Sequence, residues 1–216
     1  MELPPLSLQQ LATVVTSAPT PTELYHTLSE YEAEACLLSI QDSNQAELLS
    51  QYYATFFFSH LLTDQIREAR ISTQRMPENL LQKDPSLQNC LNLLRAVWQR
   101  NYEQVYRVLR ELPWSDQLKP LVQSYEAHFQ EKTLKEISRA YEAIRPAAAA
   151  TYLGLDPTSA AQGDSATVQK LTAYGWTWDE EAGLLHPKPV AEDPQKEARL
   201  YNELSEVMAL IGNRRS

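Results

Sequence analysis

The sequence predicts a mainly α-helical protein in which helical repeats precede a small winged helix and one last, separate helix. Three observations carry this prediction. All five glycines lie after residue 153, and glycine-free sequence with prolines and capping residues suits stacked helices joined by short turns. Two segments 36 residues apart share a pattern. After Gly175 the apolar period changes from helical spacing to the alternation typical of a strand.

Helix-start signals predict three helices in the first part of the chain. Ser7 is suited to cap a helix that runs through Val15, and Thr20-Pro21 or Thr22 can start a second helix that we expect to reach about Leu38. Ser43 precedes a third helix, the most apolar of the chain, which carries Leu48, Leu49, Tyr52, Tyr53, Phe56, Phe57 and Leu61. We expect this helix at the centre of the first core, because aromatic residues at this spacing most often serve packing.

A faint internal repeat follows. Residues 58–77 can be laid on residues 94–113 with a shift of 36 positions. In each copy a bulky residue ends one helix and a small or branched residue follows seven positions later: Leu62 and Ala69, then Trp98 and Val105. Asn101 is suited to cap the last of these helices. The period is close to the ~34 residues of tetratricopeptide helical pairs, so residues 1–114 are interpreted as a TPR-like helical-repeat region.

Residues 115–190 are interpreted as the winged-helix part, which begins with two separate helices. Pro120 is tolerated only in a first turn, so we expect a helix to start near Lys119 or Pro120. Its inward side is predicted to hold Leu121, Tyr125, His128 and Phe129. Farther on, helical spacing predicts a second helix, which Arg145-Pro146 ends and whose buried face consists of Leu134, Ile137, Tyr141 and Ile144.

Two more helices and a hairpin complete the predicted winged helix. Helices are expected at residues 147–153 and 165–174, the second stopping at Gly175. Trp176 and Trp178 then alternate as in a strand, residues 179–183 supply a turn, and residues 184–186 return before Pro187. This hairpin is suited to extend its sheet onto a neighbouring protein, and its predicted interface residues are Trp176, Trp178, Leu184 and Leu185.

These segments contain short sequence motifs that are similar to those of a known family. The motifs are Ile137-Ser138-x-Ala140-Tyr141-x-x-Ile144, Ala150-x-x-Leu153-Gly154-Leu155, Gly175-Trp176 and Pro187-Lys188-Pro189-Val190. Together they resemble the PCI domain of the family that joins a COP9 signalosome subunit, a proteasome lid subunit and a subunit of translation initiation factor 3. The resemblance covers about residues 91–190 and is strongest to the signalosome branch.

The resemblance implies a function. It implies a non-catalytic scaffold subunit of the COP9 signalosome, a cullin-deneddylating complex of the nucleus and cytoplasm, in which the chain binds neighbouring PCI subunits. The equivalent scaffold subunit of the proteasome lid or of initiation factor 3 stays as the alternative. In either case the resemblance implies that any active site belongs to another subunit.

Residues 191–216 are predicted to form a final helix. Asp193 can cap it, Pro194 suits its first position and Gly212 stands just past its end. One apolar seam recurs at steps of four, three and four: Leu200, Leu204, Val207 and Ile211. Such a seam is buried equally well against the chain's own domain or against a partner. The family resemblance implies a C-terminal helical bundle shared between subunits, so we expect an external partner.

The sequence lacks the residue patterns that commonly mark catalytic, metal-binding and cofactor-binding sites. The four histidines are isolated, and the sequence contains no HExxH, phosphate-binding glycine loop or GxSxG elbow. We therefore expect no catalytic residues, no metal and no cofactor. Residues 179–181 are three consecutive acids that point apart in a turn. Cys36 and Cys90 stand alone and are expected to be buried, reduced thiols.

The charge of the chain limits the classes of partner that it can bind. The net charge of −9 disfavours nucleic acid and anionic membrane, because both polyanions repel the chain. A DNA-binding winged helix is the remaining alternative of another class, but the helix at residues 165–174 carries one base, Lys170, and residues 133–190 hold five Lys and Arg against seven Asp and Glu. No apolar run approaches the ~18 residues that span a bilayer, and no secretory signal is evident, so we expect an intracellular chain.

Overall fold

The computed structural model describes residues 4–161 and 165–188. Its first part consists of α1 (Leu8–Ser17), α2 (Pro21–Glu30), α3 (Glu32–Ala35), α4 (Ser43–Leu62), α5 (Ile66–Arg75), α6 (Glu78–Lys83), α7 (Pro85–Trp98) and α8 (Tyr102–Glu111). The long helix α9 (Lys119–Ala140) follows. The second part consists of α10 (Pro146–Tyr152), α11 (Pro157–Ala161), α12 (Ser165–Thr172), β1 (Thr177–Asp179) and β2 (Leu184–His186). The mainly helical class with a small hairpin is confirmed, whereas the short helices α3, α6 and α11 were not predicted and α9 takes the place of two predicted helices.

The predicted helix starts are present with their caps. Ser7 Oγ accepts the Gln10 N–H at 3.1 Å, and Thr20 Oγ1 accepts the Glu23 N–H at 3.2 Å. The third helix also begins where expected, capped by Asp42. The second helix ends at Glu30 and not near Leu38, because a short separate turn, α3, follows it.

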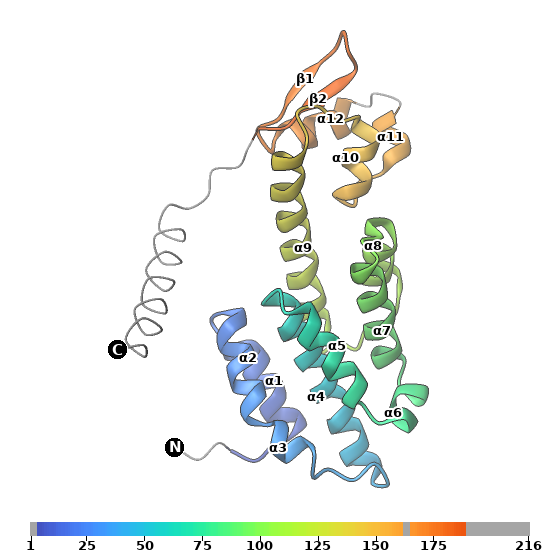
Figure 1. Ribbon diagram of the computed structural model, residues 1–216. Helices are drawn as coiled ribbons and strands as arrows, with labels where there is room; N and C mark the ends of the chain where they lie inside the picture. Colours follow the sequence, from blue (N-terminus) through green and yellow to red (C-terminus); the bar gives the residue numbers. More distant parts are fainter. Residues whose placement is uncertain (1–3, 162–164, 189–216) are drawn as a thin grey trace, which may run out of the picture.

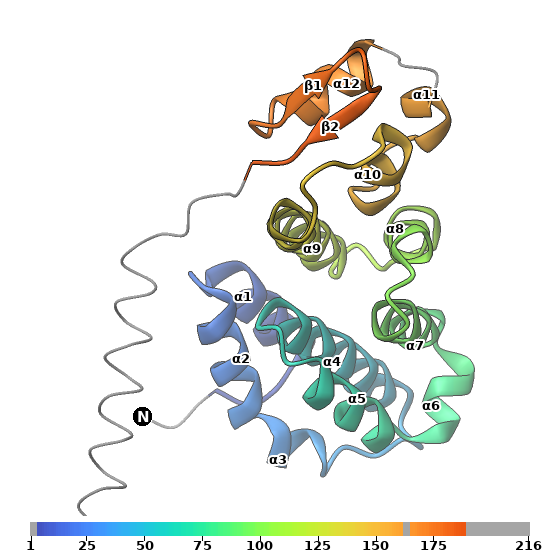
Figure 2. The same cartoon turned by 45° about the horizontal axis from the view of Figure 1, so that its top comes forward.

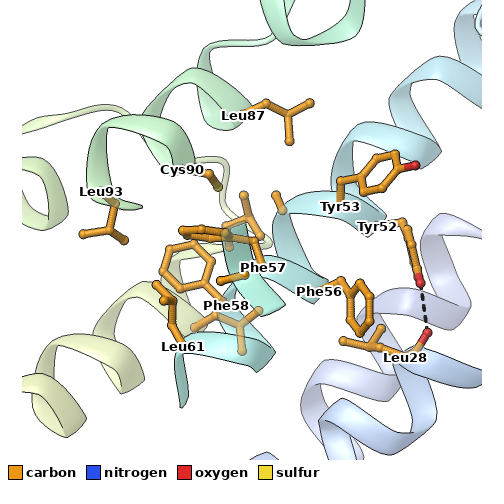
Figure 3. Close-up of a cluster of buried hydrophobic side chains, with 14 of the residues drawn as sticks. Leu28, Tyr52, Tyr53, Phe56, Phe57, Phe58, Leu61, Leu87, Cys90 and Leu93 are labelled. Carbon is orange, nitrogen blue, oxygen red and sulfur yellow. Dashed lines mark hydrogen bonds between the residues drawn. The ribbon is translucent and has the colours of Figure 1, made fainter. Parts of the chain in front are cut away.

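Helix α4 lies at the centre of the first core, as predicted. It packs against α1, α2, α5, α7 and α9. Figure 3 shows its aromatic side chains between these helices, where Phe57 and Phe58 are fully buried. The Tyr52 hydroxyl donates to the Leu28 carbonyl at 3.0 Å, which satisfies the one polar atom that this ring brings into the core.

The internal repeat is confirmed by its backbone. The α4–α5 and α7–α8 turns each contain one residue of left-handed conformation, Asp64 with φ +61° and Arg100 with φ +54°. Each turn closes with the same bond, the N–H of the next residue reaching back five positions: Gln65 to His60 at 2.8 Å and Asn101 to Ala96 at 2.9 Å. The two segments share few identical residues, but their turns have the same backbone geometry.

Helix α9 joins the two parts of the molecule. It starts at Lys119, as predicted, and runs without a break into the segment that was expected to be a second helix. Figure 1 shows its lower end against the helical repeats and its upper end beside the winged helix, and Figure 2 shows it between the two. It packs against α4, α8 and α10.

The prediction that Tyr141 lies in the core is wrong. The chain leaves the helix at Tyr141, whose backbone is extended, and its side chain is 40% exposed. Ile144 is buried as expected, but it reaches the core from an extended segment and not from the next helical turn. Arg145-Pro146 does not end this helix; Pro146 is the first residue of α10.

The two parts have separate apolar cores. The first cluster extends from Leu6 to Tyr125 and fills the space between α1 and α9. The second is much smaller and consists of Ile137, Ile144, Ala149, Leu153, Leu171, Trp176 and Leu185. The C-terminal half of α9 therefore belongs to the winged helix, as the sequence pattern at Ile137 predicted.

Candidate assembly surface

The wing is a two-stranded antiparallel hairpin in which Trp178 lies opposite Leu185. Its turn is held by Asp179, whose Oδ1 accepts the N–H groups of Glu181 at 3.0 Å and Ala182 at 3.1 Å. Gly183 completes the turn with φ +63°, a conformation that favours glycine. The carboxylate of Asp179 thus shapes the turn, while Glu180 and Glu181 are exposed to solvent.

One edge of this hairpin is already occupied. The Ile144 N–H donates to the Leu185 carbonyl at 2.8 Å, and the Leu185 N–H donates to the Ile144 carbonyl at 2.9 Å. The segment at Ile144 thus covers the outer edge of β2. Among the described residues the sheet has only two strands, so the edge left open is that of β1.

The backbone of Trp178 faces this open edge. In an antiparallel pair, successive residues direct their N–H and C=O groups alternately to one neighbour and to the other. Because Leu185 bonds to Ile144, its neighbours Leu184 and His186 bond to β1, at Asp179 and Thr177. Trp178 therefore presents its N–H and C=O outward, where a strand of another protein can pair with them.

The predicted interface residues separate into two pairs. Trp178 and Leu184 are half-buried and reach the surface of the wing. Trp176 and Leu185 do not, because they are 2% and 0% exposed within the second core. These two residues were expected at a partner interface, but they lie in the chain's own core. Alternation along a strand indicates that residues share a face, and it does not indicate whether that face packs on the chain's own core or on a partner.

Trp176 instead fixes the wing to α9. Its Nε1–H donates to Ser138 Oγ at 3.0 Å, and both groups are buried. This role of Ser138 is not predicted from the sequence; the signal for it is its place beside the core residue Ile137 on a predicted helix. A buried indole N–H requires such a partner, so this bond sets the orientation of the hairpin base.

A polar joint fixes the winged helix to the repeats. Three side chains of α8 and α9 donate to carbonyls at the end of α10: Tyr106 to Tyr152 at 3.1 Å, Arg110 to Gly154 at 2.6 Å and Gln130 to Leu153 at 2.7 Å. Burial raises the pKa of Tyr106, so its hydroxyl keeps the proton that it donates. These bonds satisfy the carbonyls that a helix end leaves unpaired.

Gly154 is required at this joint. It has φ +66°, and a Cβ at this position would lie 2.6 Å from the ring of Tyr106. The Arg110 guanidinium covers the same ring at 4.9 Å from its centroid and is also paired with Glu126. The glycine thus allows the backbone after α10 to approach the aromatic ring closely, which explains one of the glycines that mark the change of architecture.

Other predicted residues lie elsewhere. The seam of the last helix, Leu200, Leu204, Val207 and Ile211, falls outside the described residues. Cys90 is buried, and burial raises the pKa of its thiol, whereas Cys36 is exposed, contrary to expectation, because α2 ends before it. In residues 4–161 and 165–188 no cluster of three His, Cys, Asp or Glu side chains is arranged to hold a metal ion. None of the helices in these ranges is long and apolar enough to cross a membrane.

Comparison with known proteins identifies the family. Residues 47–197 match the model of the CSN8/PSMD8/EIF3K family. The chain belongs to this family. The match begins inside α4 and continues past β2, so it covers both repeat hairpins, α9 and the whole winged helix. The resemblance inferred from residues 91–190 is thereby confirmed, and the matched segment is longer than the one that the sequence motifs indicated.

Individual relatives share more than the family pattern. The chain is 58% identical over 216 residues, 100% of both chains, to a protein of Emericella nidulans named COP9 signalosome complex subunit 8. A protein of the same name from Dictyostelium discoideum is 25% identical over 173 residues, covering 78% of this chain and 84% of the relative. The one from Danio rerio is 21% identical over 169 residues, covering 76% and 83%.

Proposed function

We propose that this chain is a non-catalytic assembly subunit of the COP9 signalosome. The observation that carries the proposal is the identity of 58% over the full length of the Emericella protein, whose name places it in that complex. The family model alone would suit the equivalent subunit of the proteasome lid or of initiation factor 3. The signalosome name shared by the fungal, amoebal and fish relatives favours the first of these assemblies.

The open edge of β1 is the first proposed contact. Neighbouring PCI-domain subunits would add a strand beside Trp178, so that main-chain hydrogen bonds supply affinity and the half-buried Trp178 and Leu184 side chains supply selectivity. The joint of Tyr106, Arg110 and Gln130 supports this role, because it holds the wing at a fixed orientation to the repeats. A rigid wing loses little conformational freedom on binding.

The last helix is the second proposed contact. Its seam of Leu200, Leu204, Val207 and Ile211 would enter a helical bundle formed with other subunits. Replacing Leu204 and Val207 by Asp should then remove the chain from its complex, since carboxylates in a bundle core lose their hydration without gaining partners. Asn202→Asp with Ala209→Asp is the matched control, because these positions are two residues beyond Leu200 and Val207 and lie off the seam.

Thermal melts of the isolated chain distinguish the alternative packing. If the seam packs on the chain's own domain, the Leu204→Asp, Val207→Asp variant should melt at a lower temperature than the unchanged protein, and its loss from the complex would follow from unfolding. An unchanged melting temperature together with lost assembly supports the external bundle. An intact complex that contains this variant would contradict the proposed tether.

Catalysis is proposed to reside in other subunits. This proposal rests on the sequence, in which the histidines are isolated and the residue patterns of hydrolases are lacking. The purified chain should therefore bind no stoichiometric zinc and cleave no neddylated cullin. Elemental analysis that finds one zinc per chain after washing with chelator would contradict this part of the proposal.

The assignment to one complex is tested by affinity purification. A tagged copy of the chain, expressed in its own organism at its natural level, should co-purify with the other signalosome subunits, identified by mass spectrometry, and with deneddylating activity. The chain should also be found in both the nuclear and the cytoplasmic fractions. Co-purification of proteasome lid or initiation factor 3 subunits in stoichiometric amounts would support the alternative assemblies instead.

A further inference from the structure

A second surface lies away from the wing, where the turns of both repeat hairpins meet α9. A cavity of about 340 Å³ opens there. Its apolar lining comes from the start of α5, the end of α7 and the middle of α9, represented by Ile66, Val97 and Phe129. Asp64 and Arg100, the two left-handed turn residues, stand at its sides. The repeated turn geometry thus produces a groove that the family assignment does not explain.

Trp98 marks the rim of this groove. Its side chain is 47% exposed, whereas Leu62, the equivalent residue of the first repeat, is 6% exposed. The Arg70 guanidinium of α5 lies 5.2 Å from the centroid of the Trp98 ring. An exposed tryptophan contributes little to folding, while tryptophan and arginine are the residues that most often dominate the energy of protein interfaces.

Arginines also lie on the two helices beside this groove, and Arg100 lines the groove itself. Four arginines make no ion pair with any residue that the structure describes: Arg67, Arg70, Arg95 and Arg100. Arg67 and Arg70 share one face of α5, and Arg95 lies three residues before Trp98 on α7, so each pair covers adjacent surface. Helices α5 and α7 pack side by side. A chain of net charge −9 therefore carries unpaired positive charge around its exposed tryptophan.

Three acidic residues occur near this patch. Asp64 is engaged by Lys132 at 2.6 Å and His128 at 3.2 Å, and these bonds hold the pKa of its carboxyl at about 2. Glu68 is exposed on α5, directly after Arg67. Glu136 lies on α9 and lines the same cavity as Arg100.

We propose that this groove docks an acidic segment of a partner protein. An apolar side chain of the segment would enter the cavity beside Phe129 and stack on Trp98, while its carboxylates pair with Arg67, Arg70, Arg95 and Arg100. The cavity volume of about 340 Å³ suits one or two large side chains and is at the lower end of the ~300–1,000 Å³ range of ligand sites. A short segment is favoured over nucleic acid, because a long polyanion would meet the net negative charge of the rest of the chain.

Three synthetic peptides test this proposal on the full-length chain. The probe is a fluorescein-labelled twelve-residue peptide that repeats Glu-Glu-Leu-Phe, with binding followed by fluorescence anisotropy at low salt. One control peptide replaces every Leu and Phe by Ala, and the other replaces every Glu by Lys. The first peptide should bind at least tenfold more tightly than either control and should weaken as salt is raised. Equal binding of the alanine peptide would overturn the role of the apolar cavity.

Variants of the chain locate the binding site. Trp98→Ala and the double variant Arg70→Gln, Arg100→Gln should each weaken binding of the probe at least tenfold, with melting temperatures close to that of the unchanged chain, since all three side chains are exposed. Arg107→Gln is the matched control, because this exposed arginine of α8 lies outside the groove and pairs with Glu111. Its binding should be unchanged.

Two results would overturn the proposal. One is equal affinity for the probe in the arginine double variant and in Arg107→Gln, which would mean that the peptide binds elsewhere. The other is tighter binding of a twelve-nucleotide single-stranded oligonucleotide or of phosphatidylserine vesicles than of the peptide, reduced by the same double variant. That result would assign the arginines to phosphate groups and not to a protein segment.

Discussion

The repeat region and the winged helix differ in what holds each of them together. The repeats bury a continuous cluster of apolar side chains, from Leu6 to Tyr125, around α4, which is buried over most of its length from Leu48 to Leu62. The apolar cluster of the winged helix contains seven buried residues among those that the structure describes, and this part relies in addition on buried polar bonds, such as that from Trp176 to Ser138, and on the joint to α8 and α9. The repeat region therefore holds its structure through its own apolar core. The winged helix is smaller, and its structure depends on contacts with the repeat region.

The largest expected effect comes from the scaffold core. Phe57→Ala removes a fully buried ring from the centre of α4 and should lower the free energy of unfolding by about 3–5 kcal/mol. Because α9 packs on α4, the winged helix should unfold together with the repeats. Chemical denaturation followed by circular dichroism measures the change, and Leu37→Ala, at a residue that is 85% exposed, is the control expected to stay within about 0.5 kcal/mol. A winged helix that stays folded in Phe57→Ala would contradict the dependence inferred above.

A smaller effect is expected at the joint. Gly154→Ala forces a Cβ against the Tyr106 ring and strains a left-handed backbone, so it should lower the free energy of unfolding by about 2–4 kcal/mol. Gly183→Ala is the matched control, because this glycine has the same backbone conformation but open space around its Cβ position. It should cost only about 1–2 kcal/mol. Equal destabilisation of the two variants in denaturant titrations would mean that contact with Tyr106 is unimportant.

The smallest effect is expected where α9 is attached to the first repeat turn. Asp64→Asn keeps a residue that tolerates the left-handed backbone but removes the charge that Lys132 and His128 hold, and should cost at most about 1 kcal/mol because the site is half exposed. The folded-state pKa of Asp64 is lowered to about 2. The contribution is therefore complete above about pH 4, the ordinary pKa of Asp, and disappears as pH falls toward 2. Thermal melts of the unchanged chain and of Asp64→Asn should show a smaller difference in stability at pH 2.5 than at pH 7. A difference in stability that is the same at both pH values would contradict the proposal that it comes from the ion pairs of Asp64.

Much of the fold could be predicted because its signals are local. Ser7 and Thr20 begin their helices with side-chain caps, and the repeat shift of 36 residues was visible before the turn geometry at Asp64 and Arg100 was known. Pro120 correctly placed the start of α9. Each of these features depends on residues within one or two helical turns, which is the range over which sequence patterns are informative.

The errors arose where distant segments decide the outcome. Tyr141 matched the helical period, but the backbone straightens there so that Ile144 can pair with Leu185, which is 41 positions later in the chain. The same pairing determines which strand of the wing is open, and no local pattern contains that information. Trp176 and Leu185 were expected at a partner surface because alternation does not distinguish an internal core from an external one.

The central claim is that the open edge of β1 joins this chain to a neighbouring subunit. The most direct measurement compares Trp178→Pro with Trp178→Ala in reconstituted or co-purified complexes. Both variants remove the indole, but only proline removes the outward N–H, and an edge strand tolerates proline without loss of its own pairing. The account predicts equal melting temperatures for the two isolated variants and a further loss of complex in Trp178→Pro of at least tenfold. Equal incorporation of both variants into the complex would contradict strand addition at this edge.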